Sequence, residues 1–261
     1  MCTLTVVTGN DTYVMAMNRD EKIARGAGLS PEMHEFDGTR AMYPGDGNGG
    51  TWLATNEYGI ALALLNWNDI ALHRRAFAKP RSRGRVIPAL IDSRSLSDLH
   101  EVFGALNFTG MMPFRLVGVF PSEWEIWEWR WNSTHLDVHV HEWESRHWFS
   151  SSLSDERAES LRGAACRAAR HESDAGSERW LRRVHASHAG GPGPFSLCVH
   201  REDVRTLSYT EVTVKSGSVR MCHFLGSPCT MNPVDPQEIE IDRQRPVRPN
   251  LTVREVGCSA M

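Results

Sequence analysis

The sequence predicts an α+β fold built around antiparallel β-structure. Strand-like segments come in separate blocks, helical patterns lie between and after those blocks, and turn residues join neighbouring strands. About nine strands are expected from this pattern. With 261 residues, the chain is long enough to bury a full core as one layered domain.

The chain begins with two strand pairs. Residues 3–7 and 12–17 are expected to form a hairpin around a Gly-Asn-Asp turn, and residues 51–55 and 59–65 a second one. The last of these segments is almost entirely apolar, which is typical of a strand covered on both faces. The long intervening segments 22–50 and 67–82 are expected to be loops, and loops of this length often form substrate walls.

Helices and strands alternate in blocks through the rest of the chain. Ser95 is a plausible N-cap, and a Gly- and Pro-rich run after residue 188 ends the last helical pattern. The expected helices are 83–92, 95–106, 155–171 and 177–188, and the expected strands are 114–120, 124–131, 135–141, 195–200, 207–214 and 219–225. We expect a single domain over residues 1–230 and an extended, Pro- and charge-rich tail over 231–261.

Composition excludes several classes of function. The 29 basic and 32 acidic residues give a net charge of −3, which offers no electrostatic basis for binding nucleic acid or a membrane surface. No apolar run approaches the ~20 residues of a membrane span, and no signal-like segment opens the chain. The six cysteines form no CxxC pair and no disulfide framework. We therefore expect a cytoplasmic protein, with a homo-oligomer left open.

The second residue carries the most informative chemistry. Initiator Met is normally removed before a small residue, so the mature chain is expected to begin with Cys2. Such a residue carries a thiol nucleophile and an α-amine that titrates near ~7.7–8.0, so it could supply both the nucleophile and its base. The alternative is a small buried strand residue, because free Cys is among the most buried types.

A charged segment is expected to lie beside this cysteine. Asn18-Arg19-Asp20-Glu21 ends the second strand, and an antiparallel hairpin brings that end back to the start of the first. Asp20 could accept a hydrogen bond from the α-amine, and Arg19 could lower the thiol pKa or receive an anionic substrate group. A solvated turn is the alternative for this segment.

These residues resemble a known family. Cys2-Thr3, Asn18-Arg19-Asp20-Glu21 and Gly49-Gly50-Thr51-Trp52-Leu53-Ala54 are similar to the NRDE family, named after the transport and Golgi organisation 2 protein. Ala63-Leu64-Leu65-Asn66, Ser82-Arg83-Gly84 and the segment 200–206 extend the resemblance over most of residues 1–229. The first 70 residues are more distantly similar to choloylglycine hydrolases and penicillin V acylases, which are N-terminal nucleophile (Ntn) hydrolases.

The resemblance implies a fold and a set of roles. The fold would be a four-layer αββα sandwich. Cys2 would be the nucleophile, Asp20 would orient its amine, and the Asn66 backbone N–H would face an oxyanion. Asn18, Arg19, Trp52 and Ser151 would contact substrate. The acylases place an asparagine in the oxyanion hole, where this chain has serines at 150–152, and a second arginine in the C-terminal half, for which we identify no counterpart.

Three further patterns have simpler interpretations. Trp127, Trp129 and Trp131 share one strand face, which favours a packed aromatic face over a platform for haem or an acyl chain. His135, His139 and His141 alternate with apolar residues, as on a half-exposed strand, so no metal site is expected there. The His200-Arg201-Glu202-Asp203 segment reads as a charged turn, although His200 could also pair with Cys2. We expect no cofactor.

Two classes of function remain. The first is an N-terminal-cysteine amidohydrolase that cleaves a non-peptide C–N bond of a small-molecule amide. The second, implied only by the resemblance, is a non-catalytic haem- or lipid-handling protein on the same scaffold. The set Cys2, Arg19, Asp20 and Asn66 favours the enzyme.

Overall fold

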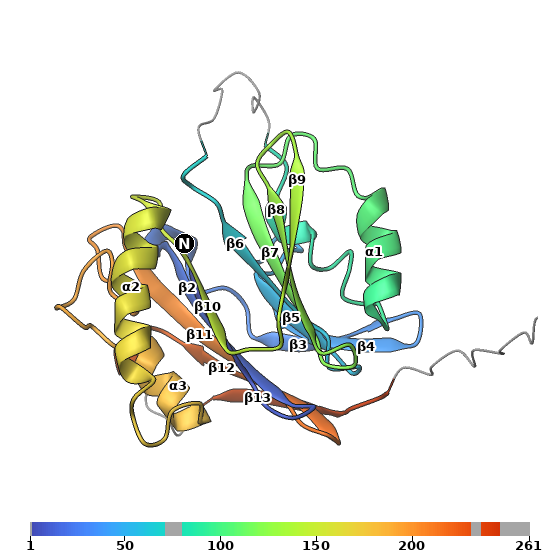
Figure 1. Cartoon of the computed structure of the whole chain (residues 1–261). Coiled ribbons are helices and arrows are strands. Elements are labelled where there is room, and N and C mark those ends of the chain that lie inside the picture. The colour runs from blue at the N-terminus through green and yellow to red at the C-terminus, as the bar shows by residue number, and fades with distance from the viewer. Residues whose placement is uncertain (1, 71–79, 231–235, 246–261) are drawn as a thin grey trace, which may run out of the picture.

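Two antiparallel sheets pack face to face, and helices cover their outer faces (Figure 1). The computed structural model describes residues 2–70, 80–230 and 236–245. Helix α1 (Leu96–Ala105) lies outside one sheet, and α2 (Asp155–Ala169) and α3 (Glu178–His185) lie outside the other. The expected αββα sandwich is therefore confirmed.

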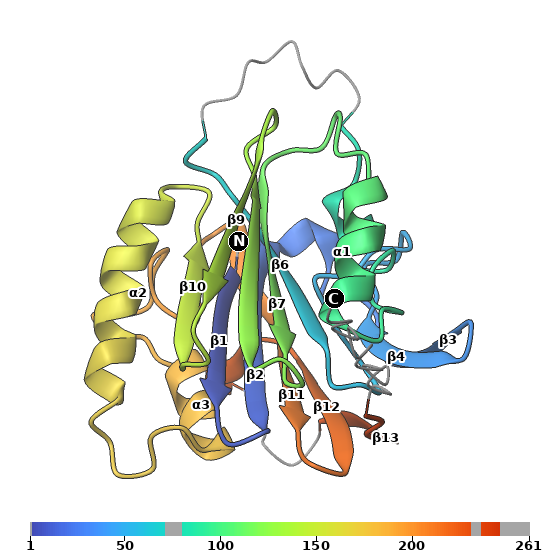
Figure 2. The same ribbon diagram turned by 45° about the vertical axis from the view of Figure 1, so that its right-hand side comes forward.

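The first sheet has six strands and contains the N-terminal hairpin. Cys2 pairs with Arg19 across that hairpin, so the expected proximity of the chain start to the charged segment is confirmed. Figure 2 shows the start of β1 between its neighbours β10 and β2. In spatial order the strands are β10 (Arg146–Ser150), β1 (Cys2–Thr8), β2 (Tyr13–Lys22), β11 (Val204–Val214), β12 (Ser218–Leu225) and β13 (Gln237–Asp242).

The second sheet has seven strands, each paired with its neighbour along the chain. The apolar strand β6 has a partner on both sides and is buried from Ala61 to Leu65, as its composition indicates. The strands are β3 (Pro31–Phe36), β4 (Thr39–Pro44), β5 (Leu53–Asn56), β6 (Ala61–Asn66), β7 (Phe114–Phe120), β8 (Glu125–Trp131) and β9 (Leu136–His141).

Three apolar layers hold the sandwich together. Between the sheets, residues such as Leu4 and Met15 of the first sheet pack with Leu53 of the second. Phe103 of α1 packs on Trp129, and Trp180 of α3 lies in the cluster on the outer face of the first sheet. Serine side chains cap all three helices, at Ser95, Ser154 and Ser177.

The expectation of a loop over residues 22–50 is wrong in part. Strands β3 and β4 lie in it, joined by Asp37 and Gly38, which both have positive φ angles. An Asp-Gly pair in this conformation is a typical two-residue hairpin turn. Pro31 opens β3 at the sheet edge, where a missing N–H costs no ladder hydrogen bond.

Three other expected elements also differ. The helix expected over 83–92 is only a 3₁₀ turn, Arg83–Arg85, followed by turns, and Pro88 within this segment disfavours a continuous helix. The strand expected over 195–200 is irregular. Side chains take up two of its carbonyls, with Asn18 bonded to that of Leu197 and Ser196 to that of Cys198. Strands Arg146–Ser150 and Gln237–Asp242 were not expected, and the second shows that part of the expected tail belongs to the sheet.

The tryptophan and histidine patterns have structural roles. Trp129 is 1% exposed beneath α1, and Trp127 and Trp131 pack beside it, which confirms the packed aromatic face. His139 is exposed, and His141 Nε2 lies 3.0 Å from the buried Glu128 carboxylate. Arg130 holds the same carboxylate through two hydrogen bonds of 2.9 Å.

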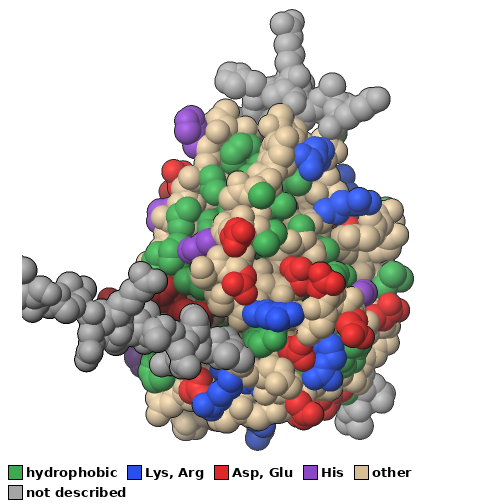
Figure 3. Space-filling view, turned by 90° about the vertical axis from the view of Figure 1, so that its right-hand side faces the viewer, with side chains coloured by type: hydrophobic (Ala, Val, Ile, Leu, Met, Phe, Trp, Pro, Cys, Tyr) green, Lys and Arg blue, Asp and Glu red, His purple; other side chains and the backbone are tan. Residues whose placement is uncertain are grey.

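The surface that carries α1 has a mixed character. Figure 3 shows acidic and basic side chains interspersed on this face, with apolar side chains between them. Among the helices that the structure describes, none combines the length and the apolar character needed to cross a membrane.

Candidate functional site

Cys2 lies at the start of a strand with a neighbour on each side. It pairs with Arg19 of β2 and with Ser150 of β10, and side chains paired in this way share one face of the sheet. That face is the inner one, where Cys2 belongs to the cluster between the sheets and is 6% exposed. The local sequence thus places the thiol inside the molecule.

A cavity of ≈ 330 Å³ opens beside Cys2. Five of the seven expected site residues line it: Cys2, Arg19, Asp20, Trp52 and Asn66. Its lining is rich in charged residue types, since seven of the sixteen described lining residues are Arg, Asp or Glu: Arg19, Asp20, Glu21, Arg25, Asp46, Arg81 and Arg83. The thiol is therefore buried and yet faces a space that a small polar molecule could enter.

Arg19 is fixed beside the thiol by contacts on two sides. Its guanidinium stacks over the Trp52 ring at 4.4 Å and donates a 3.0 Å hydrogen bond to the Gly26 carbonyl. Glu21 lies 4.0 Å away. Trp52 thus acts by positioning Arg19 as well as by lining the cavity.

Asp20 is buried among groups that hold its carboxylate. Oδ1 accepts a 2.6 Å hydrogen bond from the Thr206 hydroxyl, and Oδ2 lies 3.5 Å from the Arg162 guanidinium. Burial raises the pKa of Asp20, and Arg162 and Thr206 oppose that rise. The Asp20 carboxylate is therefore held by Thr206 and Arg162 and not by bulk water.

Arg162 is a site residue that the sequence analysis does not identify. It is 1% exposed on α2 and donates to Thr3 Oγ1 at 3.0 Å and to the Cys2 and Ser150 carbonyls at 3.4 Å each. It therefore ties β1 and β10 to Asp20. The available signal was helical spacing, because Arg162 lies on the same stripe as the buried Ala158 and Cys166.

The serine segment contributes a different residue from the expected one. The Cys2 nitrogen donates a 2.9 Å hydrogen bond to Ser150 Oγ. Ser151 is not among the residues that line the cavity, and its backbone N–H donates to Asp155 at the start of α2. Only the pairing register with β1 distinguishes the two serines.

Asn18 and Asn66 differ in their surroundings. Asn18 is fully buried, is not among the described cavity-lining residues, and donates to the His185 and Leu197 carbonyls at 2.9 and 2.8 Å. It thus anchors the end of α3 and the segment that follows. Asn66 ends β6 on the second sheet and lines the cavity from that side.

The surroundings of the Cys2 thiol act on its pKa in both directions. Burial raises the pKa most, and the Asp20 carboxylate raises it further. Arg19 and a hydrogen bond from the Asp20 backbone N–H lower it, but the net shift is upward. The thiol is therefore protonated at neutral pH, and nucleophilic attack would need a base to remove its proton.

Comparisons with known proteins identify a family and a fold. The family model described as Transport and Golgi organisation 2 matches residues 1–167. A penicillin V acylase from Agrobacterium tumefaciens is similar in structure, with a TM-score of 0.51 and 12% identity over 93% of this chain and 86% of that one. An N-acylethanolamine-hydrolyzing acid amidase orthologue from Caenorhabditis elegans has a TM-score of 0.55 and 8% identity, over 80% and 92%. No curated protein matches the sequence. At these identities the structural likeness shows the Ntn-hydrolase fold alone.

Proposed function

The chain belongs to the Transport and Golgi organisation 2 family, and we propose that it is an amide hydrolase whose nucleophile is Cys2. The observation that carries the proposal is a thiol at the second position that faces a charged cavity between Arg19, Asp20 and Asn66. The proposal requires removal of Met1, so that Cys2 carries the α-amine.

The reaction would proceed through an acyl-enzyme. The α-amine takes the thiol proton while Sγ attacks the amide carbonyl, forming a C–S bond and an oxyanion. The amine then gives the proton to the leaving nitrogen as the C–N bond breaks. Water then attacks the thioester carbonyl and gives a proton to the α-amine. As the C–S bond breaks, the amine returns that proton to the sulfur, so the carboxylic acid leaves and the thiol is restored. Every proton is accounted for without another side chain as base.

The neighbouring residues take supporting roles in this mechanism. Ser150 Oγ accepts a hydrogen bond from the Cys2 nitrogen and would hold the amine lone pair toward the sulfur. Asp20 would stabilise the protonated amine, and Arg162 would fix Asp20. The Asn66 backbone N–H would donate a hydrogen bond to the oxyanion. Loss of a single donor of this kind typically lowers kcat by about 10²–10³-fold.

The cavity charges favour an anionic substrate. Four guanidinium groups line it, and of the three carboxylates Asp20 is held by Arg162 and Thr206. We propose an amide whose acyl chain carries a carboxylate. The alternative, haem or lipid handling, has less support, because the cavity lining is charged and the tryptophan face is covered by α1.

The location is part of the same proposal. Five of the six cysteines lie among the described residues, and all five are free thiols. This supports a reducing, cytoplasmic compartment.

Selective alkylation would test the nucleophile. The purified full-length chain is treated with iodoacetamide, and intact mass and peptide mapping follow the labelling of each cysteine. We expect a mature mass that lacks one methionine and labelling of Cys2 at least about tenfold faster than of Cys166. Cys166 is the internal control. Burial raises its pKa to about 12, and it is not among the described residues that line the cavity.

Turnover is then measured with two matched substrates, N-succinyl and N-butanoyl 4-nitroanilide, which differ in a terminal carboxylate. We expect hydrolysis, faster for the succinyl compound, and its loss in Cys2→Ala. Retention of Met1, or equal labelling of Cys2 and Cys166, would contradict the proposal.

A further inference from the structure

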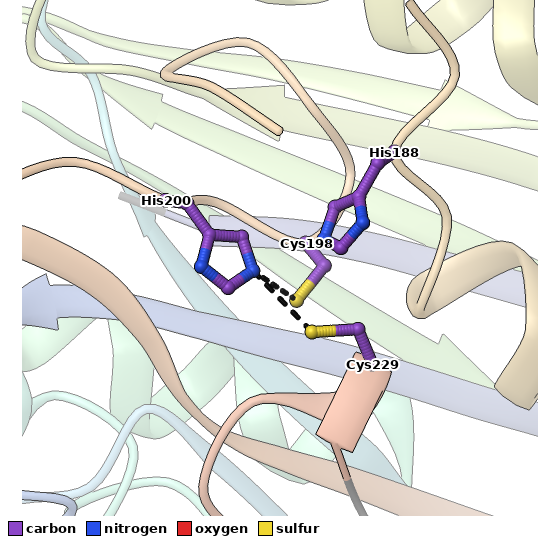
Figure 4. A group of neighbouring side chains, drawn as sticks. All are labelled: His188, Cys198, His200 and Cys229. Atoms are coloured by element: carbon purple, nitrogen blue, oxygen red, sulfur yellow. Dashed lines mark hydrogen bonds between the residues drawn. The ribbon is translucent and has the colours of Figure 1, made fainter. Parts of the chain in front are cut away.

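Four potential metal ligands converge away from the Cys2 cavity. His188 follows α3, Cys198 and His200 lie in the irregular segment before β11, and Cys229 lies in the 3₁₀ turn Pro228–Thr230 (Figure 4). One ligand atom from each lies within 4.8 Å of all the others. None of the four is among the described residues that line the Cys2 cavity.

The distances match the edges of a small coordination tetrahedron. His200 Nε2 lies 3.6 Å from Cys198 Sγ and 3.3 Å from Cys229 Sγ. With Zn–S of about 2.3 Å and Zn–N of about 2.0–2.1 Å, tetrahedral geometry separates sulfur and nitrogen ligands by about 3.5 Å. The side chains thus already stand near the spacing that a bound ion would require.

A second observation points to a bound ion at this place. His188 Nε2 is buried and has no hydrogen-bond partner among the described residues. The His188 ring lies 4.8 Å from the His200 ring, nearly perpendicular to it. A buried imidazole nitrogen without a partner is costly, and coordination to an ion at this point would satisfy it.

We propose that His188, Cys198, His200 and Cys229 bind one Zn²⁺ ion. Two thiolates and two imidazoles form a set that suits zinc, and two thiolates balance its charge. Four protein ligands leave no open position for water, so the ion is structural. These four residues are spread over residues 188–229 with no metal-ligand spacing, so the sequence alone predicts no metal site here.

The site joins segments that also support the Cys2 region. Val199, between two of the ligands, donates its N–H to Thr206 Oγ1 at 2.8 Å, and the Thr206 hydroxyl donates to Asp20. Ser227, close to Cys229, donates to the Thr206 carbonyl at 2.8 Å. The ion would therefore fix the two segments that contact Thr206, the residue that donates to Asp20.

Metal analysis of the untagged, full-length protein tests the proposal. The chain is purified without chelators and its zinc content is measured by inductively coupled plasma mass spectrometry. We expect about one equivalent per chain, and a loss of more than about tenfold in Cys198→Ser and Cys229→Ser. Cys222→Ser and Cys2→Ala are the controls and retain the metal. The buried Cys222 thiol donates a hydrogen bond to Glu238, and Cys2 lines the separate cavity.

A measurement on the unmodified chain covers the case in which the serine variants fail to fold. Zinc is exchanged for Co²⁺, and the absorption spectrum is expected to show tetrahedral d–d bands together with thiolate-to-cobalt charge transfer. Absence of zinc with no cobalt spectrum, or zinc retained in Cys198→Ser, would overturn the site. A metal-free chain whose mass is lower by two hydrogens would instead identify a Cys198–Cys229 disulfide and also overturn it.

Discussion

Cys2 and Cys198 are both buried thiols, but they face different surroundings. Burial raises the pKa of both, to about 12 for Cys198. Cys2 faces a cavity of ≈ 330 Å³ lined by charges, whereas the sulfur of Cys198 faces three other potential ligand atoms within 4.8 Å. Burial alone therefore does not distinguish a nucleophile from a metal ligand. The space and the partners in front of the sulfur do.

The two regions are joined through one threonine. Thr206 contacts Asp20 on one side and Val199 on the other, next to a register shift between Thr206 and Ser208 in β11. We therefore expect some substitutions to affect only the Cys2 cavity or only the metal-ligand cluster. Substitution of Thr206 should alter the contacts that connect the two.

Apart from replacement of Cys2 itself, the largest effect is expected from Asp20→Asn. Loss of the carboxylate that stabilises the protonated amine should lower kcat by about 10²-fold. Burial raises the pKa of Asp20, so the wild-type carboxylate takes up a proton as the pH falls, at a pH above the ordinary value of ~3.9. Activity should then fall with pH through this group in addition to the α-amine.

The measurement is the pH profile of kcat with N-succinyl 4-nitroanilide. At acidic pH the wild-type rate should depend on two protonations and the Asp20→Asn rate on one, that of the amine. Identical profiles would contradict the role of Asp20. Zinc content should not change in this variant, since Asp20 is not a ligand.

A smaller effect is expected from Thr206→Val. The substitution keeps the shape but removes the hydroxyl that donates to Asp20 and accepts from Val199. Because Asp20 keeps Arg162 but loses a hydrogen bond that opposes the rise in its pKa, we expect kcat to fall by about tenfold. Stability should fall by about 1–3 kcal/mol in urea unfolding.

The matched control for this variant is Thr213→Val in the same strand. Thr213 donates a 3.0 Å hydrogen bond to Glu178, away from both regions. It should lower stability with little change in kcat. Equal losses of kcat in the two variants would argue against a specific link between Thr206 and Asp20.

An effect confined to KM is expected from Arg19→Gln. Without the guanidinium, the KM of the succinyl substrate should rise by about tenfold, or about 1.4 kcal/mol, while the KM of the butanoyl substrate changes less. Steady-state kinetics with both substrates checks this. Arg183→Gln, which alters an exposed arginine paired with Asp174, should leave both values unchanged. A parallel rise for both substrates would indicate that Arg19 shapes the cavity without recognising charge.

Local sequence patterns predict much of the Cys2 region. The hairpin places Cys2 opposite Arg19 and next to Asp20. Trp52 and Asn66, which only the family resemblance implies, line the same cavity. The hairpin pattern does not predict which side chains of the segment 18–21 face the cavity. Alternation along β2 sends Arg19 toward the cavity and the Asn18 side chain to the backbone of α3 and the segment after it.

The sequence by itself determined the hairpins, the helix caps and the approach of Arg19 to Cys2, because these depend on neighbours within about twenty residues and on side-chain periodicity. Only the tertiary structure decided that Ser150 and Arg162 complete the surroundings of Cys2, and that His188, Cys198, His200 and Cys229 meet. The physical reason is that strand register and helix packing on the sheet set these contacts. Both arise from burial of the whole apolar core, which no local pattern specifies.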